Sequence, residues 1–346
     1  MNGNGEKETF PGVSEESLSI EVTTHCNSAC LHCFARAGVA RHSSLSIGLV
    51  KGIIAEGHNA GYRHLHITGG EPLLWDGLFE VLDYSSGMGY KAVFLNTNGT
   101  VLTKDVANRL AAYDCLSISV SLEGPEPLHD RLRGKGSYRR TVRGIERALE
   151  AGNVLIVFTV ARKGLLPELP HFAEDLYKRF PGIKYLAFIQ LIRVTDNGFA
   201  LSEELLEPED FLKLVQTVSL LNLYGLRSIV IRNPLVSVVS KLIEMPWIPQ
   251  VHPLYRDGSM IVMANRNITV VHSSRNSFGN YKAGMIQKVL ASDGYRKAVG
   301  PDETTCPSCK YVEMCRKNGM IRPSEGYRDM YSEVPYCKRV LERIAS

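Results

Sequence analysis

The sequence predicts an α/β protein that is built on a parallel sheet. Six short apolar runs rich in β-branched residues alternate with amphipathic helical stretches. Strand–helix units in series are typical of parallel sheets, because each crossover helix covers one face of the sheet. A doubly wound sheet and a barrel-type sheet both fit this alternation, and the periodicity alone does not choose between them.

The elements follow from these runs in order. The strands are expected at 18–24, 64–69, 92–98, 116–122, 154–160 and 185–192. The helices between them are expected at 46–60, 77–88, 103–113, 137–151 and 167–180. A last helix is expected at 208–225, since Pro208 and Glu209 suit a helix start and Gly225 suits its end.

The pattern changes after residue 235. Residues 258–273 predict a β-hairpin that turns near 265–267. From residue 300 onward the periodicity is weak and Cys, Pro, Gly and Tyr are frequent, which is typical of a segment held together by metal. We therefore expect a flexible tail at 1–17, a strand–helix domain at 18–235, and a small C-terminal domain at 236–346 that contains the hairpin.

The composition is that of an ordinary globular protein. The 346 residues are 44% hydrophobic and 22% charged, and the net charge of +4 is too small to argue for nucleic acid or membrane as a partner. Neither a signal peptide nor a membrane span is visible, so we expect a cytoplasmic protein with reduced cysteines. The basic run at 131–144 is expected to be a solvated loop and helix face, with a nucleic-acid site as the alternative, and it could still hold an anionic group of a ligand.

Seven of the eight cysteines fall into two clusters, which indicates metal ligation in a reducing compartment. The first cluster, Cys26, Cys30 and Cys33, directly follows the first strand, at the carboxyl edge where ligands bind in such folds. Three thiolates on a four-iron cluster leave one iron open to a small molecule. The alternative is a three-cysteine zinc site that is completed by His25 or His32.

The next two strands also end in residues suited to a ligand. The second strand runs into Gly69, Gly70, Glu71 and Pro72. The glycines let the backbone approach a ligand closely, and the glutamate can pair with an amine. The third strand ends in a polar stretch that includes Asn98.

The fourth strand alternates strictly between serine and apolar residues. Ser117, Ser119 and Ser121 share one face, and Glu123 stands at the exit of the strand. A central strand of a parallel sheet should be apolar on both faces, so a serine face predicts a polar cavity such as a barrel lumen. An edge strand that faces water is the alternative. Together, the four strand ends predict a ligand that has an amine and hydroxyls and binds an open iron.

These motifs resemble those of a known family. The stretch CNSACLHC at 26–33 has the C-x3-C-x2-C form of the radical S-adenosylmethionine (radical SAM) enzymes, and GGEP at 69–72 looks like their second motif. The resemblance, over roughly 18–235, implies a partial (β/α)6 TIM-like barrel with a [4Fe–4S] cluster on Cys26, Cys30 and Cys33. It also implies that S-adenosylmethionine chelates the open iron through its amino and carboxylate groups. The other implied contacts of this cosubstrate are His32 beside the adenine, Gly70 and Glu71 toward the methionyl amine within the motif Gly69–Pro72, and Asn98, Ser121 and Glu123 near the ribose.

The tail resembles the SPASM or twitch extension of one branch of this family. Its cysteines imply a second [4Fe–4S] cluster, fully ligated and suited to electron transfer, on Cys306, Cys309, Cys315 and Cys337. A zinc knuckle is the alternative. The stretch at 121–138 also resembles that branch, which usually has Asp where this chain has Glu123.

The tail departs from the full SPASM pattern. Gly319 stands where a further cysteine is usual, and the hairpin has His272 and Ser273 where others have a cysteine. We therefore expect one auxiliary cluster and two clusters in total, with His272 as a substitute ligand only as the lesser alternative. Cys115 is expected to be a small core residue.

The resemblance implies an enzyme that reductively cleaves S-adenosylmethionine to a 5′-deoxyadenosyl radical and abstracts a substrate hydrogen. We expect it to modify a peptide or protein, or to mature another metalloenzyme, and to take electrons from a reductant such as flavodoxin or ferredoxin. A radical dehydrogenase or epimerase that acts on a small molecule is the first alternative, and a non-enzymatic iron–sulfur or zinc protein is the second. The sequence leaves the acid–base candidates unranked: Asp196, Tyr255, Asp257 and His272.

Overall fold

The computed structural model describes most of the strand–helix part of the chain and portions of the C-terminal part. The described residues are 17–33, 35, 37–38, 43–192, 201–231, 233, 235–245, 248, 260–270, 272, 277–299, 307–317 and 336–345. Cys306, Gly319, Ser273 and the acid–base candidates Asp196, Tyr255 and Asp257 lie outside them, as does the expected tail up to residue 16.

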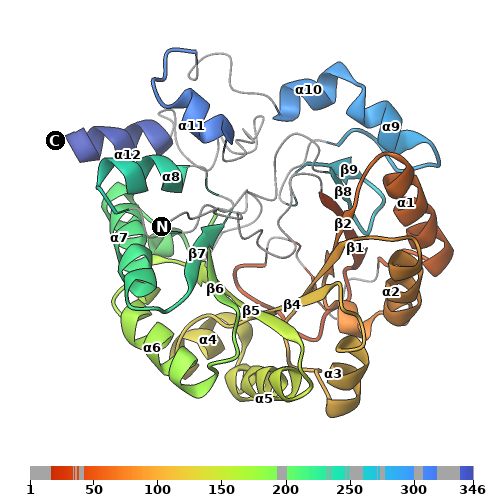
Figure 1. The fold of residues 1–346 in the computed structure, drawn as a ribbon, viewed down its shortest axis with the longest axis horizontal. Helices are drawn as coiled ribbons and strands as arrows, with labels where there is room; N and C mark the ends of the chain where they lie inside the picture. The colour runs from red at the N-terminus through yellow and green to blue at the C-terminus, as the bar shows by residue number, and fades with distance from the viewer. Residues whose placement is uncertain are drawn as a thin grey trace, which may run out of the picture.

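One sheet organises the fold. In the part of the chain that the structure describes, its nine strands have the order β7-β6-β5-β4-β3-β2-β1-β8-β9, and every neighbouring pair is parallel except β8 and β9. The strands are β1 Ser17–Thr23, β2 His64–Gly69, β3 Ala92–Thr97, β4 Leu116–Ser121, β5 Val154–Ala161, β6 Tyr185–Gln190, β7 Ser228–Ile231, β8 Met260–Val262 and β9 Ile268–Thr269. The sheet curves with the helices on its outside, so it is a partial barrel and not a doubly wound sheet (Figure 1).

The helices follow the strands in the expected alternation. Those of the barrel part are α1 Ile47–Asn59, α2 Leu78–Gly87, α3 Lys104–Leu110, α4 Glu126–Arg133, α5 Ser137–Glu150, α6 Leu169–Arg179, α7 Pro208–Leu223 and α8 Leu235–Leu242. Short 3-10 helices lie at Pro72–Leu74, Lys163–Leu165 and Ser202–Glu204. The six expected strands and the six expected helices are confirmed with small changes at their ends, whereas α4, β7 and α8 were not predicted.

The two faces of the sheet differ because side chains alternate along each strand. Outward-facing residues such as Leu18, Ile20 and Ile118 are buried against the helices in one large apolar core. The inward face is mostly polar on β1 to β4, with Phe94 on β3 as an exception, and it is apolar on β5 to β7 and at Ile261 on β8. The apolar part of this lining is Phe94, Ile156, Phe158, Tyr185, Ala187, Ile229, Ile231 and Ile261.

The serine face of β4 is part of the polar lining. β4 lies between β3 and β5, so the alternative of an edge strand facing water is wrong. Ser117 and Ser119 are buried, and Ser119 Oγ donates to Asn96 Oδ1 on β3 at 2.5 Å. The predicted polar cavity therefore corresponds to the inner wall of the barrel.

The C-terminal part returns to the barrel. The expected hairpin is confirmed as β8 and β9, and β8 extends the barrel sheet by pairing with β1. Four helices follow among the described residues, α9 Met285–Leu290, α10 Asp293–Val299, α11 Val312–Lys317 and α12 Tyr336–Ala345. α12 packs against α7, and Tyr336 Oη donates to Leu206 O, just before α7, at 3.1 Å. A domain boundary near 235 stays a prediction, since the sheet itself continues beyond that point.

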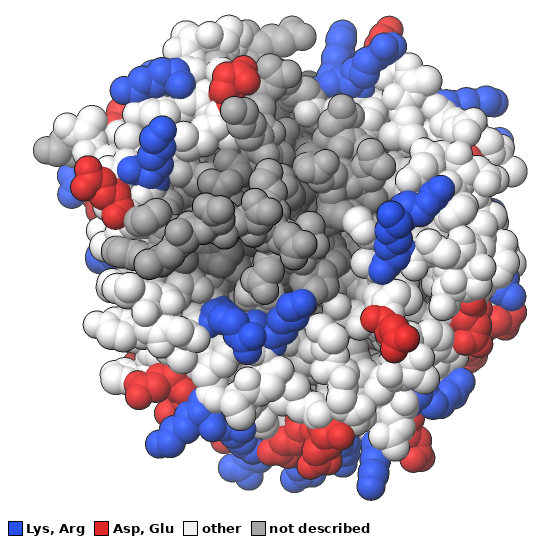
Figure 2. Space-filling view, viewed as in Figure 1, with Lys and Arg blue, Asp and Glu red and all other residues white. Residues whose placement is uncertain are grey.

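The charged side chains on one face of the molecule are mixed in sign. Figure 2 shows Lys and Arg interspersed with Asp and Glu around the rim of that face. Among the helices of the described residues, none combines the length and the apolar composition that a membrane span needs.

Candidate active site

The loops that follow β1, β2 and β3 are joined at the carboxyl edge of the sheet. Gly70 N donates to Thr23 O at 2.6 Å, and Glu71 N donates to His25 O at 2.8 Å. The loop after β3 joins them through Asn98 Nδ2, which donates to Asn27 Oδ1 at 2.8 Å. The first cysteine cluster therefore sits on a backbone that two neighbouring strand ends hold in place.

The two glycines of the second motif are needed for this contact. Gly69 has a φ of +146°, and a Cβ placed there would lie 2.3 Å from Thr23 O. A Cβ at Gly70 would lie 2.2 Å from His25 O. The sequence predicted a close approach of the backbone to a ligand, and the structure shows a close approach to the cysteine loop.

Glu71 is completely buried and holds the loop after β3. Its Oε1 accepts from Thr97 Oγ1 at 2.7 Å and from Leu73 N at 3.1 Å, and its Oε2 accepts from Asn98 N at 2.7 Å. Burial raises the pKa of this carboxyl group above its usual value, and the hydrogen bonds oppose that rise. The sequence did not predict this structural role, and a contact of Glu71 with a methionyl amine stays a prediction. Pro72 is buried and begins the 3-10 helix that follows.

The three cysteines of the first motif lie on one short loop. Cys26 is buried, whereas Cys30 and Cys33 are half-buried, and Cys33 N donates to Cys30 O at 3.1 Å. Burial raises the pKa of Cys26, and it raises the pKa of Cys30 to about 11. The negative charge of a Cys33 thiolate also raises the pKa of both Cys26 and Cys30, so the three groups are electrostatic neighbours. Binding to a metal would remove their protons.

This donor set fits an iron–sulfur cluster better than a single zinc ion. Among the described residues, no three His, Cys, Asp or Glu side chains converge closely enough to hold one metal ion. A four-iron cluster does not need such convergence, because its cysteine thiolates are bound to different irons. The three soft sulfur donors of the loop suit that cluster. Two of the sulfurs also accept hydrogen bonds: Cys26 Sγ from Asn98 Nδ2 at 3.8 Å and Cys30 Sγ from Arg133 Nη1 at 3.7 Å.

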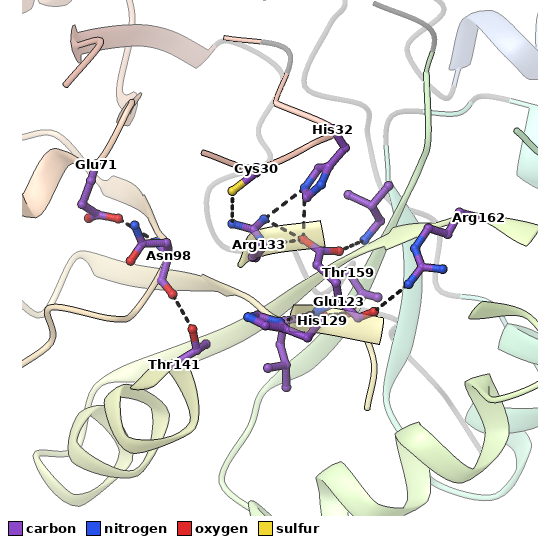
Figure 3. A network of polar contacts seen from close by, with 12 residues as sticks. Cys30, His32, Glu71, Asn98, Glu123, His129, Arg133, Thr141, Thr159 and Arg162 are labelled. Carbon is purple, nitrogen blue, oxygen red and sulfur yellow. Dashed lines mark hydrogen bonds and ion pairs between the residues drawn. The ribbon is translucent and has the colours of Figure 1, made fainter. Parts of the chain in front are cut away.

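A buried ion pair lies beside the cysteine loop (Figure 3). Glu123, at the exit of β4, accepts on Oε1 from Arg133 Nε at 2.8 Å and from Arg133 Nη2 at 2.6 Å. Its Oε2 accepts from Val160 N at 2.7 Å, and His32 Nε2 lies 3.4 Å from Oε1. Burial alone would raise the pKa of Glu123, but the charges of Arg133 and His32 hold that pKa well below its usual range.

Arg133 is the functional candidate that the sequence interpretation missed. It belongs to the basic run that was expected to be a solvated face, and that expectation is wrong for Arg133, whose side chain is only 13% exposed. The spacing of His129 and Arg133, four residues apart on α4, places both on one face of that helix. This spacing is the signal that could have revealed them.

His129, one turn before Arg133 on α4, holds the exit of β4 in place. Its Nδ1 accepts from Glu123 N at 3.1 Å, so this nitrogen carries no proton. Burial lowers the pKa of His129 to about 4, and the positive charge of Arg133 adds to this effect. The histidine is therefore neutral at ordinary pH and serves as a hydrogen-bond acceptor.

The remaining expected residues lie at the same edge of the sheet. Asn98 Oδ1 accepts from Thr100 N at 2.9 Å, and Ser121 is half-buried at the end of β4. His272 lies elsewhere, on the polar inner wall, where its Nδ1 is 2.9 Å from Glu21 Oε1. Cys115 is partly buried and packs against the core.

The part of the chain that carries this site is similar to known proteins. Residues 20–176 match the family model described as Radical SAM superfamily. The mycofactocin maturase MftC of Mycolicibacterium smegmatis is 36% identical over 184 residues, which are 52% of this chain and 45% of that protein. The AdoMet-dependent heme synthase of Oleidesulfovibrio alaskensis is 31% identical over 198 residues, which are 56% of this chain and 50% of that protein. The chain thus spans about half the length of these curated relatives.

Solved structures share the fold over nearly the whole chain. The structure of anSMEcpe with bound AdoMet and a peptide has a TM-score of 0.72 at 17% identity and covers 95% of each chain. That of Streptococcus suis SuiB bound to its precursor peptide SuiA has a TM-score of 0.69 at 17% identity, covering 89% of this chain and 71% of that one. Residues 20–176 therefore match a radical SAM domain, and the described strands form a partial barrel with the cysteine loop at its carboxyl edge.

Proposed function

We propose that this chain is a radical SAM enzyme that modifies a peptide or protein. The observation that carries the proposal is the cysteine loop at 26–33, which is fixed between the glycine turn after β2 and the Glu123–Arg133 pair after β4. A [4Fe–4S] cluster bound there would supply one electron to the sulfonium of S-adenosylmethionine and so release a 5′-deoxyadenosyl radical.

The chain's own residues would hold the reactants in distinct ways. Cys26, Cys30 and Cys33 would provide the three thiolates, and the backbone of Gly69 and Gly70 would border the methionyl group. The buried barrel wall beneath this edge would exclude water, which keeps a reactive radical from side reactions. His32, Asn98, Ser121 and Glu123 are the proposed neighbours of the adenine and ribose, because they come from the loop after β1 and the ends of β3 and β4.

A peptide or protein substrate is supported by the names of relatives. Mycofactocin maturase MftC is among the curated proteins that match, and two of the structural neighbours were solved with a peptide bound. A small-molecule substrate is the second candidate. It is supported by the relatives named AdoMet-dependent heme synthase, which match at 30% to 33% identity.

We further propose one auxiliary [4Fe–4S] cluster on Cys306, Cys309, Cys315 and Cys337. Cys309 lies just before α11, Cys315 lies within α11, and Cys337 lies within α12. Both Cys315 and Cys337 pack against the core. All three are half-buried, and Cys306 lies outside the described residues. A reductant such as flavodoxin or ferredoxin would deliver electrons in the cytoplasm.

The proposal is tested with oxygen-free, reconstituted full-length protein. Two clusters would give roughly eight irons per chain, and one would give roughly four. Reduction in the presence of S-adenosylmethionine should yield 5′-deoxyadenosine. The Cys30→Ala variant should yield none, whereas the matched Cys115→Ala variant, which removes a thiol outside both clusters, should behave as the wild type. A wild-type protein that forms no 5′-deoxyadenosine would contradict the proposal.

A further inference from the structure

The guanidinium of Arg133 links the exit of β4 to the cysteine loop. Arg133 is the last residue of α4 and donates through Nη1 to Cys30 Sγ at 3.7 Å. Its Nε and Nη2 donate to the same oxygen of Glu123 at 2.8 and 2.6 Å. The three contacts use different nitrogens of one planar group, so the carboxylate fixes the orientation in which Nη1 faces the sulfur (Figure 3).

The backbone keeps Arg133 at this place independently of its own side chain. Leu31 N, in the residue after Cys30, donates to Leu132 O at 2.9 Å, which ties the cysteine loop directly to the last turn of α4. His129, one turn earlier, holds α4 to β4 through Glu123 N. α4 is therefore bonded both to the cysteine loop and to the exit of β4, and these two attachments set the distance between Arg133 and Cys30.

A cation at this position favours extra negative charge on the sulfur it contacts. Reduction adds one electron to an iron–sulfur cluster, and hydrogen bonds to its sulfurs as well as nearby charges set its potential. The Arg133 side chain is 13% exposed and that of Glu123 is 1% exposed, so solvent screens the guanidinium only weakly. Both Cys30 and Cys33 interact with the charge of Arg133.

We propose that Arg133 raises the reduction potential of the cluster on Cys26, Cys30 and Cys33, and that Glu123 is the positioning residue that orients the Arg133 guanidinium. The inference rests on the proposed function, because it requires a cluster at these thiolates. Removal of the guanidinium takes away one hydrogen bond and one positive charge beside the cluster. The oxidised form should then be favoured at any given potential.

The test is a redox titration of the reconstituted full-length protein without S-adenosylmethionine, in which electron paramagnetic resonance measures the reduced cluster. The signal that belongs to the first cluster is the one that Cys30→Ala removes. Arg133→Gln should lower its midpoint potential, with at least a tenfold fall in the ratio of reduced to oxidised cluster, which is about 59 mV for one electron. The matched control is Arg131→Gln on the same helix, whose exposed side chain lies near Glu204, and it should leave the potential unchanged.

Further variants separate the possible failures. Arg133→Lys keeps the charge but loses the planar fork, so it should shift the potential in the same direction by a smaller amount. It also replaces Arg133→Gln as the test if the glutamine variant binds less iron than the wild type. An unchanged potential in both Arg133 variants, or an equal shift in Arg131→Gln, would overturn the inference while leaving the proposed function intact. A wild-type protein with no cluster signal that depends on Cys30 would overturn both.

Discussion

The two cysteine clusters of this chain differ in how their surroundings hold them. The first lies between three strand ends, and its loop is fixed by backbone hydrogen bonds from Gly70 and Glu71 and by a buried ion pair. The described members of the second lie on or next to the short helices α11 and α12, which pack on the outside of the barrel. Under the proposed function, the first site binds a cosubstrate and the second conducts electrons.

The largest expected effect separates the two clusters. Cys33→Ala should abolish 5′-deoxyadenosine formation, a loss of more than about a hundredfold, since even the partners of metal ligands are worth about 10–100-fold. Cys315→Ala should lose roughly four irons per chain and still cleave S-adenosylmethionine. Iron analysis and chromatography of the nucleoside measure both. Equal loss of cleavage in the two variants would remove the distinction between the sites.

The next effect concerns the backbone contact beneath the first cluster. Gly70→Ala would place a Cβ 2.2 Å from His25 O, so the loop must shift, and we expect a destabilisation of about 1–3 kcal/mol together with a lower iron content. Gly48→Ala is the matched control, because nothing lies within 4 Å of its new Cβ and it sits in α1. Chemical denaturation and iron counting check the pair, and a tolerated Gly70→Ala would show that the close approach is unnecessary.

A smaller effect appears in the pH dependence of stability. Burial lowers the pKa of His129 from 6.5 to about 4 in the folded protein, so the unfolded chain binds more protons between these values. The contribution of His129 is therefore fully present above pH 6.5 and is lost as the pH falls toward 4. We expect a loss of about 1–3 kcal/mol over this window. Denaturation curves of the wild type and His129→Gln at several pH values measure it, and equal slopes would contradict the assignment.

The smallest expected effect lies at the attachment of α12. Arg339 Nη2 is 2.6 Å from Glu207 Oε2, but both side chains are substantially exposed, so Arg339→Ala should cost less than about 1 kcal/mol. Tyr336 is buried and donates to the backbone of the segment before α7, so Tyr336→Ala should cost about 3–5 kcal/mol. Thermal melting compares the two. A larger loss from Arg339→Ala would mean that α12 is held by charge and not by packing.

The strand–helix part was predictable because its signals are local. Periodicity located each of the six strands and the hairpin, and the serine alternation on β4 correctly indicated a polar inner wall. The short elements α4, β7 and α8 were not predicted, since a strand of four residues such as β7 has too few positions to show a hydrophobic period. α4 lies in a stretch rich in proline, glycine and charge, and its last residues fall in the run at 131–144 that was interpreted as a solvated face.

The site was predictable in its motifs but not in its contacts. The cysteine loop and the glycine turn were found from spacing, yet the full burial of Glu71 under the loop after β3 depends on partners that are far apart in the sequence. The same holds for Arg133, which looks like one of several basic residues until Glu123 and Cys30 are placed beside it. A charged residue is recognised as buried only when its tertiary partners are known.

The most direct test of the central claim is the electron paramagnetic resonance spectrum of oxygen-free, reduced protein with and without S-adenosylmethionine. We expect the signal that depends on Cys30 to change when the cosubstrate is added, and to do so equally in the Cys315→Ala variant. A spectrum that S-adenosylmethionine leaves unaltered, or zinc in place of iron at the first cluster, would contradict the account.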